Sequence, residues 1–351
     1  MRDNSTIIQG RICSGSGEGA SFTQLEWARE QFIAQMGIEP HSGTLNLTLE
    51  TPEAQSHWAR LLASPGQTIT PPQPDWCSAR CYPVRIADRF PGAIVYPDVP
   101  QYPAEQIEII AALPLRERLS LQDGDMLSLE TSAPLAARAV IFDVDGTLVD
   151  SMPAFHILIS RATAPHGIAV PPTTIREALI TQQSFWEILL PPDAPHREAL
   201  IAEVRADAER MWPDVLREHG RVFPGVGESL RELRARGLRL GIVTASTNGS
   251  FHPLHQANML RHFGEIIAGK DVKRRKPDPE GLLRCAAALG VAPEAAVYVG
   301  DAPLDIQASR AAGMASVAVL SGAGDSALLS AEGPTRIIAN LSHLPEILAI
   351  A

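Results

Sequence analysis

The chain has 351 residues, which is long for one domain and sufficient for two, because domains usually have about 100 to 200 residues. Acidic residues outnumber basic residues by 40 to 30, and the formal net charge of -10 disfavours non-specific binding to nucleic acid or anionic lipid. No apolar run approaches the ~20 residues of a membrane span, and the first residues lack the apolar core of a signal peptide. We therefore expect a cytoplasmic protein with no nucleic-acid or membrane partner. Binding of small ligands, including phosphates, remains compatible with this charge.

Up to about residue 132, the apolar residues form short runs separated by glycine and proline. The one long helical period covers residues 23–36. Short strands with this punctuation are typical of a β-barrel or β-sandwich that carries a helix or two. Residues 1–132 are therefore predicted to form a separate, mainly-β domain, and the proline- and alanine-rich segment 130–137 is the predicted linker.

From about residue 137 onward, apolar strands alternate with helical segments. The expected strands are 139–142, 238–243, 296–299 and 316–320, and the expected helices include 227–236 and 279–289. This alternation predicts an α/β, Rossmann-like parallel sheet covered by helices, over residues 133–351. Residues from about 153 to 222 interrupt the pattern with helices, of which 198–217 is the longest, and we interpret them as a helical cap insertion.

Polar residues follow the ends of the predicted strands or lie in one loop between them: Asp143, Asp145, Thr244, Lys276, Asp301 and Asp305. In an open parallel sheet, ligands bind outside the carboxyl ends of the strands. Clustered carboxylates repel one another unless a hard cation lies among them, and oxygen-only ligands indicate Mg²⁺. One aspartate could then attack phosphorus while its neighbour protonates the leaving oxygen. Thr244 would donate to a phosphoryl oxygen, and Lys276 would neutralise developing charge.

The lysines of the chain are confined to one short segment. Lys270, Lys273 and Lys276 are the only three, whereas arginine occurs throughout. A lysine kept where arginine is otherwise preferred indicates a need for a compact point charge.

Taken in order, these residues resemble the four motifs of the haloacid dehalogenase superfamily, specifically of its phosphoglycolate-phosphatase-like branch. Asp143-Val-Asp-Gly-Thr147 resembles motif one, and Thr244 resembles motif two. Lys276 with Pro277-Asp-Pro279 resembles motif three, and Gly300-Asp301 with Asp305 resembles motif four. The resemblance covers roughly residues 138–322, and it implies that 153–222 is the small cap of that branch.

The resemblance also implies a role for each residue. Asp143 would be the nucleophile that becomes an aspartyl phosphate, and Asp145 would be the acid and then the base. Thr244 and Lys276 would complete the catalytic set. The magnesium ligands would be Asp143, the carbonyl of Asp145 and Asp301, with Asp305 supporting the metal or Lys276.

Two related activities fit the sequence less well than hydrolysis. Phosphonoacetaldehyde hydrolases form a Schiff base with a cap lysine, and residues 153–222 contain no lysine. Hexose-phosphate mutases place a histidine ten residues after the second acid of motif one, where this chain has Phe155, with His156 one step away. Hydrolysis of a phosphomonoester is therefore expected, and a mutase remains open if the alignment slips by one residue.

Two stretches of residues 1–132 have a residue pattern that could bind a phosphate or a metal ion. Gly15, Gly17 and Gly19 follow a short apolar strand. Glycines at this spacing are typical of a loop whose backbone N–H groups approach a phosphate closely. An ordinary flexible hairpin is the alternative interpretation. Thr44 and Asn46 point to the same side of an extended segment. Their oxygens could ligate Mg²⁺ beside a triphosphate, although a solvent-facing strand explains the pattern equally well.

With later blocks such as Gly92-Ala-Ile-Val-Tyr-Pro97, these stretches resemble the archaeal-type, CTP-dependent riboflavin kinases from about residue 8 to 130. The resemblance implies a compact β-barrel that uses CTP, or ATP, to phosphorylate riboflavin. It also implies sites for the nucleotide and for Mg²⁺, with Gly15, Gly17, Glu18 and Gly19 on the nucleotide and Thr44 and Asn46 on the metal.

The sequence thus predicts a bifunctional enzyme of flavin metabolism. A Mg²⁺-dependent phosphomonoester hydrolase is joined to a kinase that converts riboflavin to FMN. The alternative is a phosphatase of phosphoglycolate or a sugar phosphate, whose N-terminal domain is a non-catalytic sensor of flavin or nucleotide.

Overall fold

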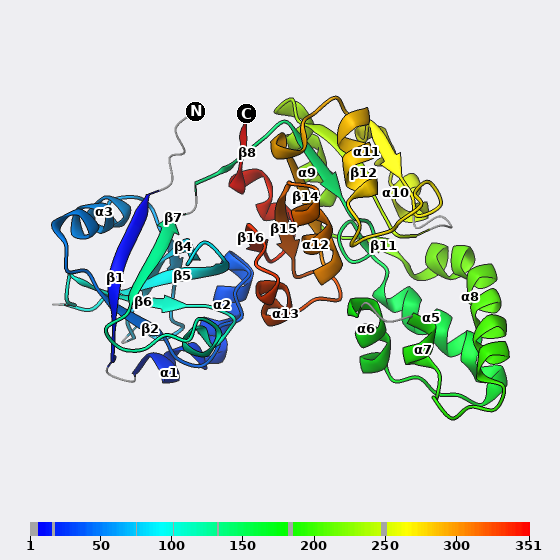
Figure 1. Ribbon diagram of the computed structural model, residues 1–351, viewed down its shortest axis with the longest axis horizontal. Coiled ribbons are helices and arrows are strands. Elements are labelled where there is room, and N and C mark those ends of the chain that lie inside the picture. The colour runs from blue at the N-terminus through cyan, green and yellow to red at the C-terminus, as the bar shows by residue number, and fades with distance from the viewer. Residues whose placement is uncertain are drawn as a thin grey trace. The chain divides into compact units, whose positions relative to one another are not determined.

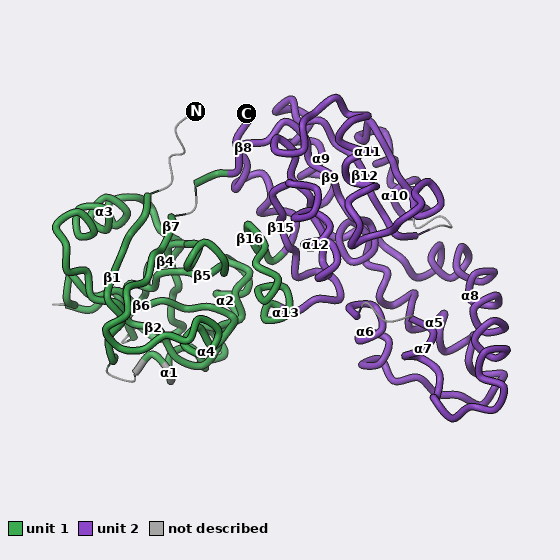
Figure 2. The backbone as a smooth tube through the Cα atoms, viewed as in Figure 1, with its two compact units in different colours: residues 1–134, 326–339 green, residues 135–325, 340–351 purple. Residues whose placement is uncertain are grey.

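The computed structural model describes residues 6–15, 18–74, 76–100, 102–131, 133–181, 185–246 and 251–351, without the side chains of Glu18 and Ala20. The chain divides into two compact units (Figure 2). The first contains Met1–Pro134 with Ser326–Ala339, and the second contains Leu135–Asp325 with Asn340–Ala351. Residues 326–339, which the sequence pattern assigned to the second domain, therefore belong to the first unit.

The first unit contains a closed antiparallel β-barrel (Figure 1). Its strands follow one another in the order β4-β5-β6-β2-β1-β7, and a pairing of β4 with β7 closes the barrel. Strand β3 pairs with the first three residues of β4. The strands are β1 (Ile7–Cys13), β2 (Leu45–Thr48), β3 (Gln67–Ile69), β4 (Ala79–Ile86), β5 (Phe90–Pro97), β6 (Gln106–Ile110) and β7 (Met126–Thr131). The prediction of a mainly-β barrel is confirmed.

The alternating pattern of β1 shows why these residues form a barrel wall. Ile8, Gly10 and Ile12 are buried while the residues between them are exposed, as expected when one face of a strand covers a core. Gly10 brings β1 close to β2, because a Cβ atom there would lie 2.9 Å from the Cβ of Leu47.

Helices surround this barrel. They are α1 (Glu18–Thr23), α2 (Glu26–Met36), α3 (Pro52–Leu62) and α4 (Leu115–Arg118), and the late segment adds α13 (Ser326–Ala331) and the strand β16 (Arg336–Ile338). The helix expected over 23–36 is shorter, because Leu25 is extended and α2 starts after it. Gly37 ends α2 in the left-handed conformation that glycine adopts at little cost.

The second unit contains a parallel sheet. Its strands lie in the order β13-β12-β9-β14-β15, so β9, which comes first among them in the sequence, is the central strand. They are β9 (Ala139–Phe142), β12 (Arg239–Val243), β13 (Glu265–Ile267), β14 (Ala296–Gly300) and β15 (Ala315–Val319). The prediction of a Rossmann-like parallel sheet is confirmed.

Helices connect these parallel strands. The α-helices are α9 (Val226–Ala235), α10 (His252–Gln256), α11 (Glu280–Ala288) and α12 (Pro303–Ala311). The short 3₁₀ helices of the unit are η1 (Ala164–His166), η2 (Leu260–His262), η3 (Pro293–Ala295), η4 (Leu341–His343) and η5 (Pro345–Ile347). Every residue of the inner strands β9 and β14 is buried, as expected of a sheet covered on both faces.

A helical insertion follows β9. The short strands β10 (Val149–Asp150) and β11 (Arg221–Val222) pair antiparallel at its base. Between them lie α5 (Met152–Thr163), α6 (Pro172–Ile180), α7 (Phe185–Leu189) and α8 (Arg197–His219), which we call the cap (Figure 1). Its core contains Ile159, Ile175, Ala178 and Leu189.

The segment expected to be a linker is partly a strand. Residues 135–137 form β8 (Leu135–Ala137), which pairs in parallel with β17 (Leu348–Ile350). The pattern of prolines and alanines in 130–137 could not reveal this pairing, because its partner lies more than two hundred residues later in the chain.

Candidate functional site

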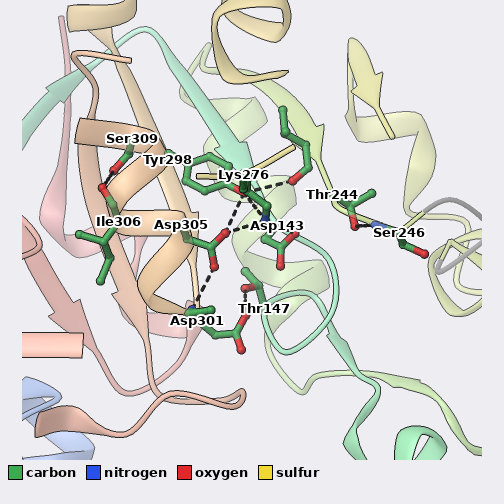
Figure 3. Close-up of polar contacts among 12 residues, drawn as sticks. Asp143, Thr147, Thr244, Ser246, Lys276, Tyr298, Asp301, Asp305, Ile306 and Ser309 are labelled. Carbon is green, nitrogen blue, oxygen red and sulfur yellow. Dashed lines mark hydrogen bonds and ion pairs between the residues drawn. The ribbon is translucent and has the colours of Figure 1, made fainter. Parts of the chain in front are cut away.

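Five of the polar residues predicted in the second unit lie together at one edge of its sheet, namely Asp143, Thr244, Lys276, Asp301 and Asp305 (Figure 3). Asp143 directly follows β9, Thr244 follows β12 and Asp301 follows β14, so these three stand at the carboxyl ends of adjacent strands. Lys276 reaches the same place from the loop before α11, and Asp305 from the first turn of α12. The structure thus brings together residues that are far apart in the sequence.

The ammonium group of Lys276 is the centre of this cluster. It donates to Asp143 Oδ1 at 2.8 Å, to Asp305 Oδ1 at 2.6 Å and to the Tyr298 hydroxyl at 3.0 Å. Its side chain is only 4% exposed. Burial by itself lowers the pKa of Lys276, but the two carboxylates raise it well above its ordinary value, so the group stays charged.

Asp301 is held from two directions. Its Oδ1 accepts a hydrogen bond from the Thr147 hydroxyl at 3.1 Å, and its Oδ2 accepts from the Ala323 amide at 2.8 Å. Gly146 and Gly322 leave room for it, because Cβ atoms there would lie 2.3 and 1.9 Å from Asp301 Oδ2. The backbone on both sides is therefore shaped around this carboxylate.

Burial and mutual repulsion affect the acids. Oxygens of Asp143, Asp301 and Asp305 lie within 4.8 Å of one another, and all three residues are buried. Burial, with the charges of the other two acids, raises the pKa of Asp143 well above its ordinary value although Lys276 opposes the shift. Burial and Asp305 raise the pKa of Asp301 to about 7. A cluster that disfavours its own ionisation fits a hard divalent cation, which would relieve this repulsion.

Asp145 and Thr244 complete the set. Both line a cavity of about 370 Å³ together with Asp143, Lys276 and Asp301. Thr244 Oγ1 accepts from the Ser246 amide at 3.1 Å, which leaves its own proton for an oxygen in the cavity. All the site residues predicted in this unit therefore lie in or beside one cavity.

The cap closes the other side of the same cavity. Phe155 lines it, whereas His156, the residue considered for a mutase, is absent from the described lining residues. Mutase chemistry therefore has no support from the position of this histidine.

The residues predicted in the first unit also meet. A Cβ atom at Gly15 would lie 2.3 Å from Asn46 Nδ2, and one at Gly19 would lie 2.4 Å from Thr44 Oγ1, so Gly15 packs directly on Asn46 and Gly19 on Thr44. Asn46 Nδ2 is 3.5 Å from Thr44 Oγ1. Gly17 and the side chain of Glu18 lie outside the described residues.

Glu108 lies beneath this pair. Its Oε2 accepts from the Thr44 hydroxyl at 2.9 Å and its Oε1 accepts from the Tyr102 hydroxyl at 2.8 Å. Burial, together with this hydrogen bond, raises the pKa of Tyr102. Thr44 also lines a cavity of about 220 Å³ with His41, Leu113 and residues of α4. The oxygens of Thr44, Asn46 and Glu108 are of the kind that Mg²⁺ prefers.

Some site residues were not predicted from the sequence. Tyr298 contacts Lys276 and donates to the Val243 carbonyl at 3.1 Å, but it stands in an apolar strand and has the pattern of a core residue. The sequence could have identified Thr147 as a site residue, because it is the last residue of the Asp143-Val-Asp-Gly-Thr147 motif. Tyr102 lies in Gln101-Tyr-Pro103, one of the blocks that resemble the riboflavin kinases, but no role was predicted for it.

Comparison with known families agrees with this geometry. Residues 140–319 match the family model described as haloacid dehalogenase-like hydrolase. The chain belongs to the haloacid dehalogenase-like hydrolases. Residues 12–131 match the CTP-dependent riboflavin kinase model, which carries the description domain of unknown function DUF120. The two predicted resemblances are confirmed, and both matches are to enzyme families.

Individual relatives of this haloacid dehalogenase-like hydrolase point to one branch. The phosphoglycolate phosphatase of Escherichia coli (strain K12) is 32% identical over 209 residues, which are 53% of this chain and 82% of the relative. The phosphoglycolate phosphatase of Salmonella typhi is 33% identical over the same shares. The predicted likeness of the second unit to phosphoglycolate phosphatases is therefore confirmed.

Solved structures share the fold. A predicted phosphoglycolate phosphatase from Haemophilus somnus has a TM-score of 0.54 and 22% identity, and covers 60% of this chain and 97% of its own. A hydrolase from Pseudomonas syringae has a TM-score of 0.51 and 23% identity, with 60% and 100% covered. Among the described residues, no helix is both long and apolar enough to cross a membrane.

Proposed function

We propose that the second unit is a Mg²⁺-dependent phosphomonoester hydrolase that acts through an aspartyl phosphate, and that the first unit phosphorylates riboflavin to FMN. The observation that carries the hydrolase proposal is the buried Asp143–Lys276 pair at the sheet edge, 2.8 Å apart and beside two further acids. A buried nucleophile next to a fixed positive charge fits transfer of an anionic group.

The proposed reaction has two steps. A carboxylate oxygen of Asp143 attacks phosphorus, the phosphorus–oxygen ester bond breaks, and Asp145 gives its proton to the leaving alkoxide. Asp145 then takes a proton from a water molecule whose oxygen attacks the same phosphorus, which breaks the bond to Asp143 and releases phosphate. Thr244 donates a hydrogen bond to a phosphoryl oxygen, and the Lys276 ammonium opposes the developing negative charge.

Magnesium has a place in this arrangement. Asp143, the Asp145 carbonyl and Asp301 would hold the ion, which when bound neutralises charge on the carboxylates and the phosphoryl group. Asp305 lies 2.6 Å from Lys276 Nζ and would hold that ammonium toward Asp143.

For the first unit, the proposal rests on the packing of Gly15 against Asn46 and of Gly19 against Thr44. Two glycines without Cβ atoms next to two side-chain oxygens fit the close approach of a triphosphate, and Thr44 and Asn46 would hold the Mg²⁺ that accompanies it. Glu108 accepts the hydrogen bond of Thr44 and thereby orients its oxygen. The donor is proposed to be CTP, with ATP as the alternative.

Crossed variants test both activities. We expect Asp143→Asn to lower hydrolysis of p-nitrophenyl phosphate by at least about 1000-fold and to keep FMN formation from riboflavin, Mg²⁺ and CTP or ATP. Asn46→Ala should do the reverse. Asp193→Asn, at an exposed acid of the cap, is the matched control and should change neither.

The failures of the two proposals can be told apart in the same assays. Hydrolysis that persists in Asp143→Asn would contradict the hydrolase mechanism. If neither wild type nor Asp143→Asn forms FMN with either nucleotide while wild type hydrolyses esters, the kinase proposal is wrong and the sensor alternative is supported.

A further inference from the structure

The cap supplies an apolar, aromatic wall to the hydrolase cavity. Residues that line it come from each of the four cap helices: Phe155 and Leu158 from α5, Leu179 from α6, Phe185 and Trp186 from α7, and Trp212 from α8. The cavity of about 370 Å³ lies within the ~300–1,000 Å³ common for small-molecule sites. Apart from Glu209 of α8, the charged residues among the described lining lie at the sheet edge, so the phosphate and the organic group face different walls.

The rings of this wall contact one another. Phe155 stacks on Trp212 with centroids 4.5 Å apart and planes at 27°. Phe185 is 6.3 Å from Phe155 and meets Trp186 edge-on at 5.1 Å. Trp212 is only 7% exposed, so its position is set by packing. Preset ring faces and edges are complementary to a planar aromatic group, which gains ring–ring attraction as well as burial.

The same wall is poorly suited to a small anionic substrate. Glu209 is the one charged side chain among the described cap residues that line the cavity, and it is an acid. Its ion-pair partner Arg205, at 2.9 Å, is absent from the described lining. Arg275 and Lys276 lie on the sheet side, where the phosphate binds. A second carboxylate on the substrate would therefore be buried against the cap without a cation, which is costly.

We infer that the hydrolase prefers phosphomonoesters of alcohols that carry a planar aromatic ring, and that the ring binds against Phe155, Trp186 and Trp212. The inference rests on the proposed hydrolase function of the same cavity. It names a class of substrate that differs from phosphoglycolate, the substrate in the names of the similar phosphatases.

A matched set of primary alkyl esters tests this preference without changing the leaving group. The set is phenylethyl, cyclohexylethyl and ethyl phosphate, with phosphoglycolate added, and the readout is kcat/KM from phosphate release by the full chain. We expect phenylethyl phosphate to exceed ethyl phosphate and phosphoglycolate by at least about tenfold, and cyclohexylethyl phosphate by about threefold.

Variants locate the preference in the cap. Trp212→Leu and Trp186→Leu should each lower the ratio of kcat/KM for phenylethyl over ethyl phosphate by about fivefold or more. Val204→Ala, a buried change in the same helix α8 at a residue outside the described lining, should leave this ratio as in wild type. Trp186→Leu serves if Trp212→Leu fails to fold, because Trp186 is less buried.

The inference and the function on which it rests fail in different ways. Equal kcat/KM values for phenylethyl, cyclohexylethyl and ethyl phosphate, or a preference for phosphoglycolate, would overturn the inference while Asp143-dependent hydrolysis stands. Absence of Asp143-dependent hydrolysis of every ester, including p-nitrophenyl phosphate, would overturn the proposed function itself.

Discussion

Lys276 contributes a positive charge where three buried acids meet. Its three donors all have partners, namely two carboxylates and the Tyr298 hydroxyl. An ammonium group supplies a compact charge with three donors, whereas a planar guanidinium could not point at these acceptors from the same position. This geometry explains why lysine rather than arginine stands at position 276.

Replacing Lys276 with methionine should damage both activity and stability. The variant leaves buried carboxylates without their cation, so we expect the free energy of unfolding of the second unit to fall by about 3 kcal/mol in the presence of EDTA. Hydrolysis should fall below detection. Urea denaturation of Lys276→Met, compared with Lys270→Met at an exposed position of the same segment, measures the effect. Equal midpoints for the two variants would contradict the role assigned to Lys276.

Asp301 makes the metal-free protein sensitive to pH. Its pKa is raised from 3.8 to about 7, so the folded state binds its proton more tightly than the unfolded state. The group therefore contributes stability that is complete below its unfolded pKa and is lost as the pH rises to about 7.

In EDTA, the melting temperature of the second unit should accordingly fall between about pH 4 and about pH 7, and Mg²⁺ should restore it at the upper end. Differential scanning calorimetry across this range measures the effect. Asp301→Asn, which cannot ionise, should show a flatter dependence. A melting temperature that rises with pH in EDTA would refute this account of the cluster.

At the scale of elements, the turn after β9 is built around a neighbouring strand end. Gly146 has φ +80° and its missing Cβ leaves the space that Asp301 occupies. Gly167, in the cap, also has a positive φ, of +68°, but a Cβ there would have no atom within 4 Å. A substitution at Gly167 would strain only the backbone, whereas one at Gly146 would strain the backbone and also crowd Asp301.

Both glycines changed to alanine therefore form a matched test. Gly167→Ala should lower the free energy of unfolding by about 1 kcal/mol and keep hydrolysis, because only its backbone is strained. Gly146→Ala should lower kcat/KM by at least about 100-fold, since Asp301 must move. The measurement is steady-state kinetics with p-nitrophenyl phosphate. Similar kcat/KM values for the two variants would show that the close approach of Gly146 to Asp301 is not needed for catalysis.

At the scale of the whole molecule, local patterns predicted much of both units. Strand 139–142 appears as β9 with the same bounds, and helix 198–217 appears as α8 with two further residues at its carboxyl end and one at its amino end. The strand is a continuous apolar run and the helix is amphipathic, and both patterns are properties of residues that are close in the sequence. The pairing of β8 with β17 and the place of 326–339 in the first unit were missed, because each depends on contacts between distant segments.

The sequence by itself determined which residues stand at the strand ends, since motif order and an apolar strand before each motif are local features. Its resemblance to the riboflavin kinases also predicted one site for Gly15, Gly19, Thr44 and Asn46, and the structure places these residues next to one another. Only the tertiary structure decided that Tyr298 contacts Lys276, that Glu108 supports Thr44, and that rings from three cap helices line the hydrolase cavity. The physical reason is that apolar side chains look alike in sequence, whether they fill a core or face a ligand, until packing places them.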